Sequence, residues 1–173
     1  YILAAIFTLT ACTAKAPEQY EQLDTAPEMF PDYRDITVPS NIAPLNFKIT
    51  SPGERFITVF TNGDYSVTLK GAITDMPLRL WKKFRTSGKD ISVNVYAQES
   101  GKWNLYKPFR ICFAEPIDQY ISYRVIPPGY QSYQELTINQ RDLTSFKEKI
   151  IFCNSLIQPS NDIGSCINCH HYR

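Results

Sequence analysis

The sequence is short of histidine and of glycine, and each shortage excludes a class of enzyme. Among its 173 residues there are only 2 histidines, His170 and His171, so a Ser/His/Asp catalytic set cannot form elsewhere in the chain. The 7 glycines make no phosphate-binding loop, and paired carboxylates such as Asp32 and Asp35 are too common to indicate hydrolysis. We therefore expect the protein not to be an enzyme.

An excess of charge and a long apolar run are also missing. The formal net charge is only +1, which gives no electrostatic reason to expect a nucleic-acid partner. The apolar run at residues 1–11 is shorter than the roughly 20 residues that a membrane-spanning helix needs. Aromatic residues, in contrast, make up 13% of the chain, with 11 Tyr and 10 Phe against 2 Met, a balance that favours strands.

Residues 1–11 are typical of a secretory signal, because an uncharged apolar stretch ends in small residues before Cys12. The chain starts with Tyr and lacks the basic region of a signal, so we expect a truncated signal and a fragment of a longer protein. Leu9-Thr10-Ala11-Cys12 resembles the bacterial lipobox, which predicts cleavage before Cys12 and its lipidation. A lipid anchor would hold the protein at the membrane of the bacterial cell envelope, as a periplasmic or outer-membrane lipoprotein. The alternative is an ordinary signal with a chance cysteine.

The most specific motif lies near the carboxyl end, where Cys166-Ile167-Asn168-Cys169-His170 forms a C-x-x-C-H run. Two thiols at this spacing can add to the two vinyl groups of one porphyrin, and the adjacent imidazole can ligate the iron. The motif therefore predicts covalent haem c, with Cys166 and Cys169 holding the porphyrin and His170 as the metal ligand. We expect an electron-transfer or redox role with a redox protein as partner.

Three alternatives for this motif remain open. Zinc accepts two thiolates and an imidazole, but a structural zinc site needs four ligands and the sequence has no second Cys/His pair to complete it. A thioredoxin-like dithiol starts a helix after a strand, which the loop-rich approach Pro159-Ser160-Asn161-Asp162 does not offer. A structural disulfide would not need the histidine.

The second axial ligand of such a haem is left open by the sequence. His171 is adjacent to His170 and cannot readily reach the opposite side of the same porphyrin, so we interpret it as a surface residue. Met29 and Met76 are formal candidates, because thioether ligation is common in cytochromes, although methionine is more often a packing residue.

The order of patterns along the chain predicts its domains. Residues 12–44 are rich in proline, which excludes a helix, and we expect a lipid-anchored tether whose first half is flexible and whose second half is extended. Residues 45–130 are expected to form a β-sandwich, and residues 131–173 an irregular segment that ends in the C-x-x-C-H motif. Strand patterns cover residues 45–49, 55–60, 65–69, 91–98, 103–113 and 120–126, with turns at Asn62-Gly63 and Ser100-Gly101. The predicted fold class is mainly β, an immunoglobulin-like β-sandwich with one short helix.

The one predicted helix follows Asp75-Met76-Pro77, with Asp75 as its cap and Gly88 at its end. Its apolar face consists of Leu78, Trp81 and Phe84. Its other face is basic and consists of Arg79, Lys82, Lys83 and Arg85. We interpret the basic face as solvated, the alternative being a docking surface for an acidic partner.

Two further patterns have more than one interpretation. Cys112 and Cys153 either form a disulfide in an oxidising compartment or remain two buried thiols. A group of aromatic residues either stacks on sugars or packs in the core and at sheet edges, and we favour packing. Its members are Trp103, Tyr106, Tyr130 and Tyr133.

Several segments of the sequence resemble a known family over more residues than chance would give. They are residues 33–39, 41–47, 123–130, 140–143 and 154–156, together with the C-x-N-C-H run. Through them the chain, from about residue 28, resembles a family of exported Gram-negative lipoproteins named as cytochrome c biosynthesis proteins or TolB-like proteins. The resemblance implies an N-terminal sandwich followed by a β-propeller. Family members often continue the motif with Ser-Phe, whereas this chain has His171-Tyr172.

Two functions of different classes follow from these observations. The first is a lipid-anchored exported protein that carries a c-type haem and relays electrons. The alternative is a non-redox cell-envelope module that binds a glycan or a protein, is fused to a propeller absent from this chain, and uses the cysteine motif structurally.

Overall fold

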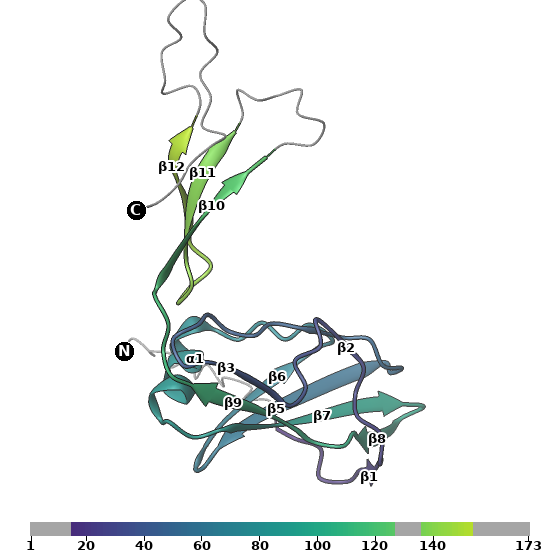
Figure 1. Cartoon of the computed structure of the whole chain (residues 1–173). Helices are drawn as coiled ribbons and strands as arrows, with labels where there is room; N and C mark the ends of the chain where they lie inside the picture. The colour runs from purple at the N-terminus through teal and green to yellow at the C-terminus, as the bar shows by residue number, and fades with distance from the viewer. Residues whose placement is uncertain (1–14, 127–135, 154–173) are drawn as a thin grey trace, which may run out of the picture. The chain divides into compact units, whose positions relative to one another are not determined.

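The computed structural model describes residues 15–126 and 136–153. Over these residues the protein is mainly β, with several sheets and one helix (Figure 1), which confirms the predicted class of a β-sandwich with one short helix. The chain divides into two compact units. Unit 1 comprises residues up to 38 and residues 45–113, and unit 2 comprises residues 39–44 and those from 114 onward.

Unit 1 is built on a seven-stranded sheet with the order β1-β8-β7-β5-β6, to which β9 is added on β7 and β3 on β9. Strand β1 runs parallel to β8, whereas β5 is antiparallel to both β6 and β7. The strands are β1 (Glu21–Gln22), β3 (Ile36–Pro39), β5 (Arg55–Asn62), β6 (Tyr65–Lys70), β7 (Ile91–Glu99), β8 (Lys102–Leu105) and β9 (Phe109–Ala114).

Both predicted turns join neighbouring strands of this sheet. Asn62 pairs with Tyr65 at the end of the β5–β6 hairpin, where Gly63 has a φ of 58°. Glu99 pairs with Lys102 across the β7–β8 turn, where Ser100 and Gly101 have φ values of 48° and 82°. Short hairpin loops need positive φ because only that backbone twist matches the twist of the flanking strands.

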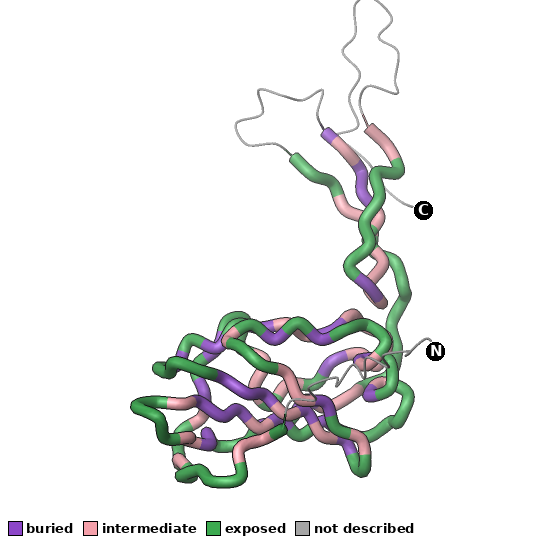
Figure 2. Tube along the Cα trace, turned by 180° about the vertical axis from the view of Figure 1, so that it is seen from behind, coloured by how far each residue is buried: buried purple, intermediate pink, exposed green. Residues whose placement is uncertain are grey.

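The inner face of the sheet carries an aromatic core. Strand β7 presents Ile91, Val93, Val95 and Ala97 to it, each with at most 1% of its surface exposed, as the alternation of the sequence predicts. The ring of Phe47 lies 6.3 Å from that of Phe60 and 6.2 Å from that of Phe109, measured between centroids. Phe47 precedes β4 (Lys48–Ile49), which pairs with β2 (Met29–Phe30), so this strand pair forms a second layer. Buried residues concentrate along the strands of unit 1 (Figure 2).

The helix α1 (Leu78–Thr86) completes this layer by burying Trp81 and Phe84. Its predicted cap is wrong, because Pro77 occupies the N-cap position without any side-chain hydrogen bond. The Asp75 carboxylate instead accepts a hydrogen bond of 3.3 Å from the Asn46 side chain, whose oxygen accepts one of 3.1 Å from the Met76 amide. The predicted end is right, since Gly88 follows the C-cap with a φ of 66°.

Part of the expected tether belongs to the sheet. Strands β1, β2 and β3 lie between residues 21 and 39 and pair with β8, β4 and β9 respectively, and Pro27 is fully buried. Proline excludes a helix but leaves the backbone extended, and extended segments can add to sheet edges. The prediction of a flexible first half is therefore wrong for the described residues of that segment.

The predicted strand over residues 103–113 is two strands that both pair with β7. Pro108 has no amide to donate to a ladder, and the chain leaves the sheet around it. The Lys107 amide donates to the Thr25 carbonyl over 2.9 Å, which ties this break to the lead-in segment.

Unit 2 contains a three-stranded antiparallel sheet of β10 (Tyr120–Val125), β11 (Thr137–Asp142) and β12 (Glu148–Cys153). Its small core is Leu136 and Ile138, against which Phe152 packs. Residues beyond 131 are thus more regular than expected, and β10 pairs with β11 rather than with the strands of unit 1. Pairing between strands that are distant in the sequence depends on side-chain packing. The periodicity of the sequence therefore does not predict it.

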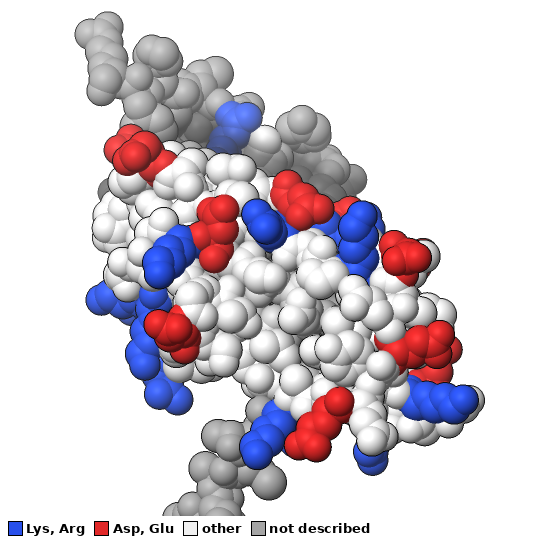
Figure 3. Space-filling model, turned by 90° about the horizontal axis from the view of Figure 1, so that it is seen from below, with Lys and Arg blue, Asp and Glu red and all other residues white. Residues whose placement is uncertain are grey.

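Charged side chains of both signs cover the protein. On the face shown in Figure 3, Lys and Arg are interspersed with Asp and Glu around uncharged surface, in keeping with the net charge of +1. An ion pair joins Arg34 to Asp32 over 2.6 Å, and the hydrogen bonds from Arg34 hold the pKa of Asp32 at about 2.

Candidate functional site

The residues predicted to hold lipid and haem lie outside the described residues. These are Cys12, Cys166, Cys169 and His170, and the same holds for His171, Tyr130 and Tyr133. Among the residues that the structure describes, no group of three or more His, Cys, Asp or Glu is placed to hold a metal ion. No helix in these ranges is long and apolar enough to cross a membrane.

The remaining sulfur-containing residues belong to the two units. No disulfide joins Cys112 to Cys153 in the described part of the chain, and both side chains are half-buried. A hydrogen bond with the Asp90 side chain raises the pKa of the Cys112 thiol. Met29 and Met76 are 8% and 3% exposed, so both have the burial of packing residues.

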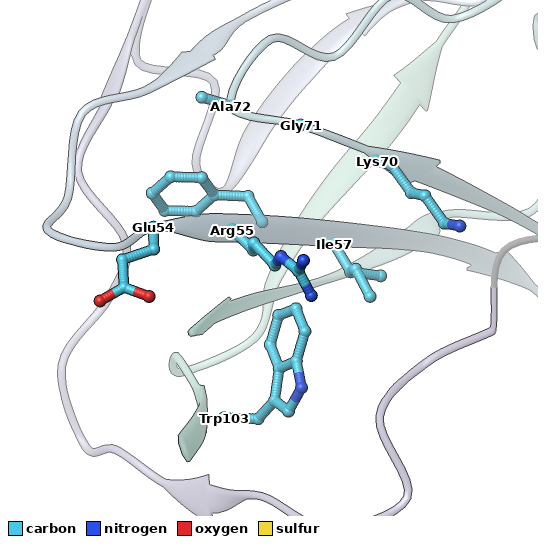
Figure 4. Close-up of a pocket in the computed structure, with 8 residues that line it drawn as sticks. Glu54, Arg55, Ile57, Lys70, Gly71, Ala72 and Trp103 are labelled. Carbon is cyan, nitrogen blue, oxygen red and sulfur yellow. The ribbon is translucent and has the colours of Figure 1, made fainter. Parts of the chain in front are cut away.

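A pocket with a volume of about 580 Å³ lies on unit 1 (Figure 4). It lies where β5, β6 and β8 contribute side chains to the outer face of the sheet. Its lining residues are Glu54, Arg55, Phe56, Ile57, Lys70, Gly71, Ala72 and Trp103.

The strand register explains why these side chains meet. Arg55 on β5 pairs with Gln98 on β7, and Gln98 pairs with Trp103 on β8, so one cross-strand row carries both the guanidinium and the indole. Ile57 lies two residues beyond Arg55 on the same face and pairs directly with Lys70 on β6. Side chains directly opposite each other on one face of a sheet are close neighbours.

Two lining residues of the pocket, Ile57 and Trp103, belong to an apolar cluster. Ile57, Tyr96 and Leu105 form a buried cluster, against which Trp103 and Val59 pack. This packing fixes the indole on one edge and leaves Trp103 half-buried. A ring supported in this way loses little conformational freedom when a ligand stacks on it.

Trp103 also lines a second pocket, of about 430 Å³, together with Gln19, Tyr20, Glu21, Gly101 and Lys102. Trp103 therefore contributes to the lining of both pockets. Tyr20 is 47% exposed, and its ring packs edge-on against Tyr96 with 5.3 Å between centroids. Two aromatic side chains thus stand on this outer face.

The described members of the predicted aromatic group, Trp103 and Tyr106, have different environments. Tyr106 is only 7% exposed and belongs to the core, as the packing interpretation expects, whereas Trp103 lies at the pockets. Sequence reasoning missed Tyr20, Arg55 and Lys70 as site residues. Tyr20 lies in the segment interpreted as a tether, and nothing in the local pattern places it beside β8.

The charges at the first pocket favour an anion. Arg55 and Lys70 are exposed, and neither forms a salt bridge with a carboxylate of the described residues. Glu54 supplies the one acidic side chain of the lining. Two cations against one carboxylate leave the pocket with an excess of positive charge in an otherwise apolar setting.

Three of the four residues predicted for the basic face of α1 are exposed, whereas Arg85 is half-buried. Arg79, Lys82 and Lys83 are exposed, and the Lys83 ammonium lies 5.3 Å from the centroid of the Tyr65 ring. Exposed cation–aromatic contacts of this type contribute about 0.5–1 kcal/mol.

Unit 2 carries a polar cluster around Glu148. The Asn139 amide donates a hydrogen bond to its carboxylate, and the hydrogen bond from the Tyr123 hydroxyl lowers the pKa of Glu148. The same bond raises the pKa of Tyr123. The hydrogen bonds to Glu148 link the three strands of the sheet, whereas the buried Asn139 Oδ1 has no hydrogen-bond partner among the described residues.

Comparison of the chain with models of protein families, with curated proteins and with solved structures found no match.

Proposed function

We propose that this protein is a lipid-anchored protein of the bacterial cell envelope that carries a covalent c-type haem and transfers single electrons. The observation that carries the proposal is the run Cys166-Ile167-Asn168-Cys169-His170. The apolar segment before Cys12 supports export to a compartment where such a haem can be attached.

The side chains of the motif have the chemistry that is needed to hold a haem. Two thiols two residues apart match the two vinyl groups of one porphyrin, and the imidazole of His170 follows at once as an iron ligand. Bound haem supplies a one-electron couple, and Cys166 and Cys169 would hold it while His170 fixes one axial position. A redox protein would be the partner, reached while the lipid on Cys12 keeps the protein at the membrane.

Expression of the full chain together with the cytochrome maturation machinery tests this proposal. We expect a coloured protein whose mass is increased by one haem and whose reduced spectrum has the α-band of a c-type haem. Cys166→Ser and Cys169→Ser should each remove part of the covalent attachment, whereas Cys112→Ser, a thiol outside the motif, should leave it unchanged. Colourless protein with Cys166 and Cys169 free, joined to each other or bound to zinc would overturn the proposal.

A second candidate function is a cell-envelope binding module, and the pockets at Trp103 favour it. An indole supported by an apolar cluster and flanked by Arg55 and Lys70 offers both a stacking surface and charge. Pockets of about 300–1,000 Å³ that combine apolar lining with a few polar groups are typical of small-molecule sites. The two functions are compatible, because they use different parts of the chain.

A further inference from the structure

We propose that the two pockets that share Trp103 form one binding site for an acidic oligosaccharide, with the indole between two sugar subsites. The proposal rests on the second candidate function, that of a binding module, and it names the ligand class. It is independent of the haem.

The first argument is the position of the indole. Trp103 lines both the pocket of about 580 Å³ and the pocket of about 430 Å³. A chain of linked sugar rings that crosses the sheet there can place one ring in each pocket and stack a C–H face on the indole. Aromatic rings suit this contact because they are rigid and amphipathic.

The second argument is the aromatic residue in the second pocket. Tyr20 lines it together with Trp103 and is 47% exposed. Its edge-on contact with Tyr96 holds the ring in place. A sugar in this pocket would therefore meet two supported aromatic side chains, while Gln19 and Glu21 offer hydrogen-bonding groups to its hydroxyls.

The third argument is charge, and it selects an acidic sugar. Figure 4 shows the Arg55 guanidinium pointing toward the Trp103 indole, with Lys70 reaching out from the neighbouring strand. A carboxylate on a sugar stacked on Trp103 would lie next to the Arg55 guanidinium, and Lys70 adds positive charge to the same pocket. A guanidinium binds a carboxylate through two parallel hydrogen bonds, which gives orientation as well as affinity. Glu54 is then available to accept hydrogen bonds from hydroxyl groups.

The shape of the site favours a narrow chain over a protein surface. Protein interfaces have broad apolar cores of well-packed aromatic residues, whereas here two pockets share one tryptophan and both have charged side chains in their lining. A linear chain of sugar rings can occupy both pockets and stack on Trp103.

Isothermal titration calorimetry of tetragalacturonate with the full chain tests the proposal. The methyl-esterified tetrasaccharide is the uncharged control ligand. We expect binding of the acid to exceed that of the ester and to weaken with added salt, since exposed charge interactions are screened. Trp103→Ala should weaken both by about tenfold through loss of stacking. Arg55→Gln should weaken only the acid, by about fivefold, because it removes one charge-assisted contact at an exposed site.

Two control variants distinguish the loss of a ligand contact from a loss of folding. Trp103→Phe keeps an aromatic ring on the apolar cluster and should recover part of the binding lost in Trp103→Ala. Lys107→Gln removes an exposed cation outside both pockets and should bind like the parent protein.

The results distinguish a wrong ligand class from a wrong candidate function. Equal affinity for acid and ester, with Trp103 still required, would overturn the acidic class while leaving a binding module. Binding of an acidic peptide but of neither oligosaccharide would overturn the saccharide and identify a protein partner. No binding of any of the three probes would overturn both the inference and the binding-module function.

Discussion

Asp142 shows how a single carboxylate organises a turn in unit 2. It is the last residue of β11 and accepts hydrogen bonds from the Thr144 amide over 2.9 Å and from the Thr144 hydroxyl over 2.7 Å. The Ser145 hydroxyl donates to its other oxygen over 2.9 Å. Because Thr144, above all, bonds to the charged form, the pKa of Asp142 falls from 3.8 to about 2.

This lowered pKa gives a pH prediction. A carboxyl group whose pKa is lower in the folded than in the unfolded chain stabilises the fold above its unfolded pKa, and this stabilisation is lost as the pH falls through the folded pKa. The contribution of Asp142 is therefore complete above its ordinary value of 3.8 and disappears toward about 2. Urea unfolding of the parent and of Asp142→Asn, followed through this window, should give stability curves that converge as the pH falls.

The control for this experiment is Asp118→Asn, which removes one charge at an exposed position of the same unit. Curves of the parent and Asp142→Asn that stay parallel from pH 5 to pH 2 would contradict the assigned cause.

At the scale of elements, α1 depends on packing rather than on capping. It has no acidic residue in its first turn and no side-chain cap, and a helix of 9 residues is marginal in water by itself. Its stability comes from Trp81 and Phe84. The ring of Phe84 lies 4.7 Å from that of Tyr65 and 6.5 Å from that of Phe60, which ties the helix to the β5–β6 hairpin.

We expect Phe84→Ala to lower the free energy of unfolding by about 3–5 kcal/mol, because it leaves a cavity among buried rings. The matched control is Leu78→Ala on the same helix, where the side chain is 45% exposed and the cost should stay below about 1 kcal/mol. Chemical denaturation measures both. Similar costs for the two variants would show that α1 is held by intrinsic propensity and not by its buried face.

At the scale of the whole molecule, the proposed lipid on Cys12 decides where the protein is found. No described helix can span a membrane, and several acyl chains on one cysteine give stable anchoring, whereas a single chain binds only marginally. The oligosaccharide site would then work at a membrane surface, and the haem motif at the other end of the sequence.

We expect the mature parent protein to enter the detergent-rich phase on phase partitioning and Cys12→Ser to remain in the aqueous phase. Mass spectrometry should find the acyl chains on Cys12 in the parent alone. Cys112→Ser, which changes a thiol inside unit 1, should partition like the parent. Detergent-phase partitioning of Cys12→Ser would exclude an anchor at this residue.

The sequence by itself determined the elements whose signals are local. Alternation in residues 91–98 predicted β7, glycines with positive φ marked the β5–β6 and β7–β8 turns, and the spacing of Trp81 and Phe84 predicted the buried face of α1. The motifs at Cys12 and at residues 166–170 lie outside the described residues and stay predictions. Each of these depends on neighbours within a few residues, where backbone geometry and side-chain spacing act directly.

Only the tertiary structure decided how distant segments combine. It placed the proline-rich lead-in on the large sheet through β1 and β3 and on β4 through β2. It also paired β10 with β11 and brought Tyr20, Arg55 and Lys70 to the pockets at Trp103. Strand pairing joins residues that are far apart in the chain, and the partner is selected by packing and burial that no local pattern contains.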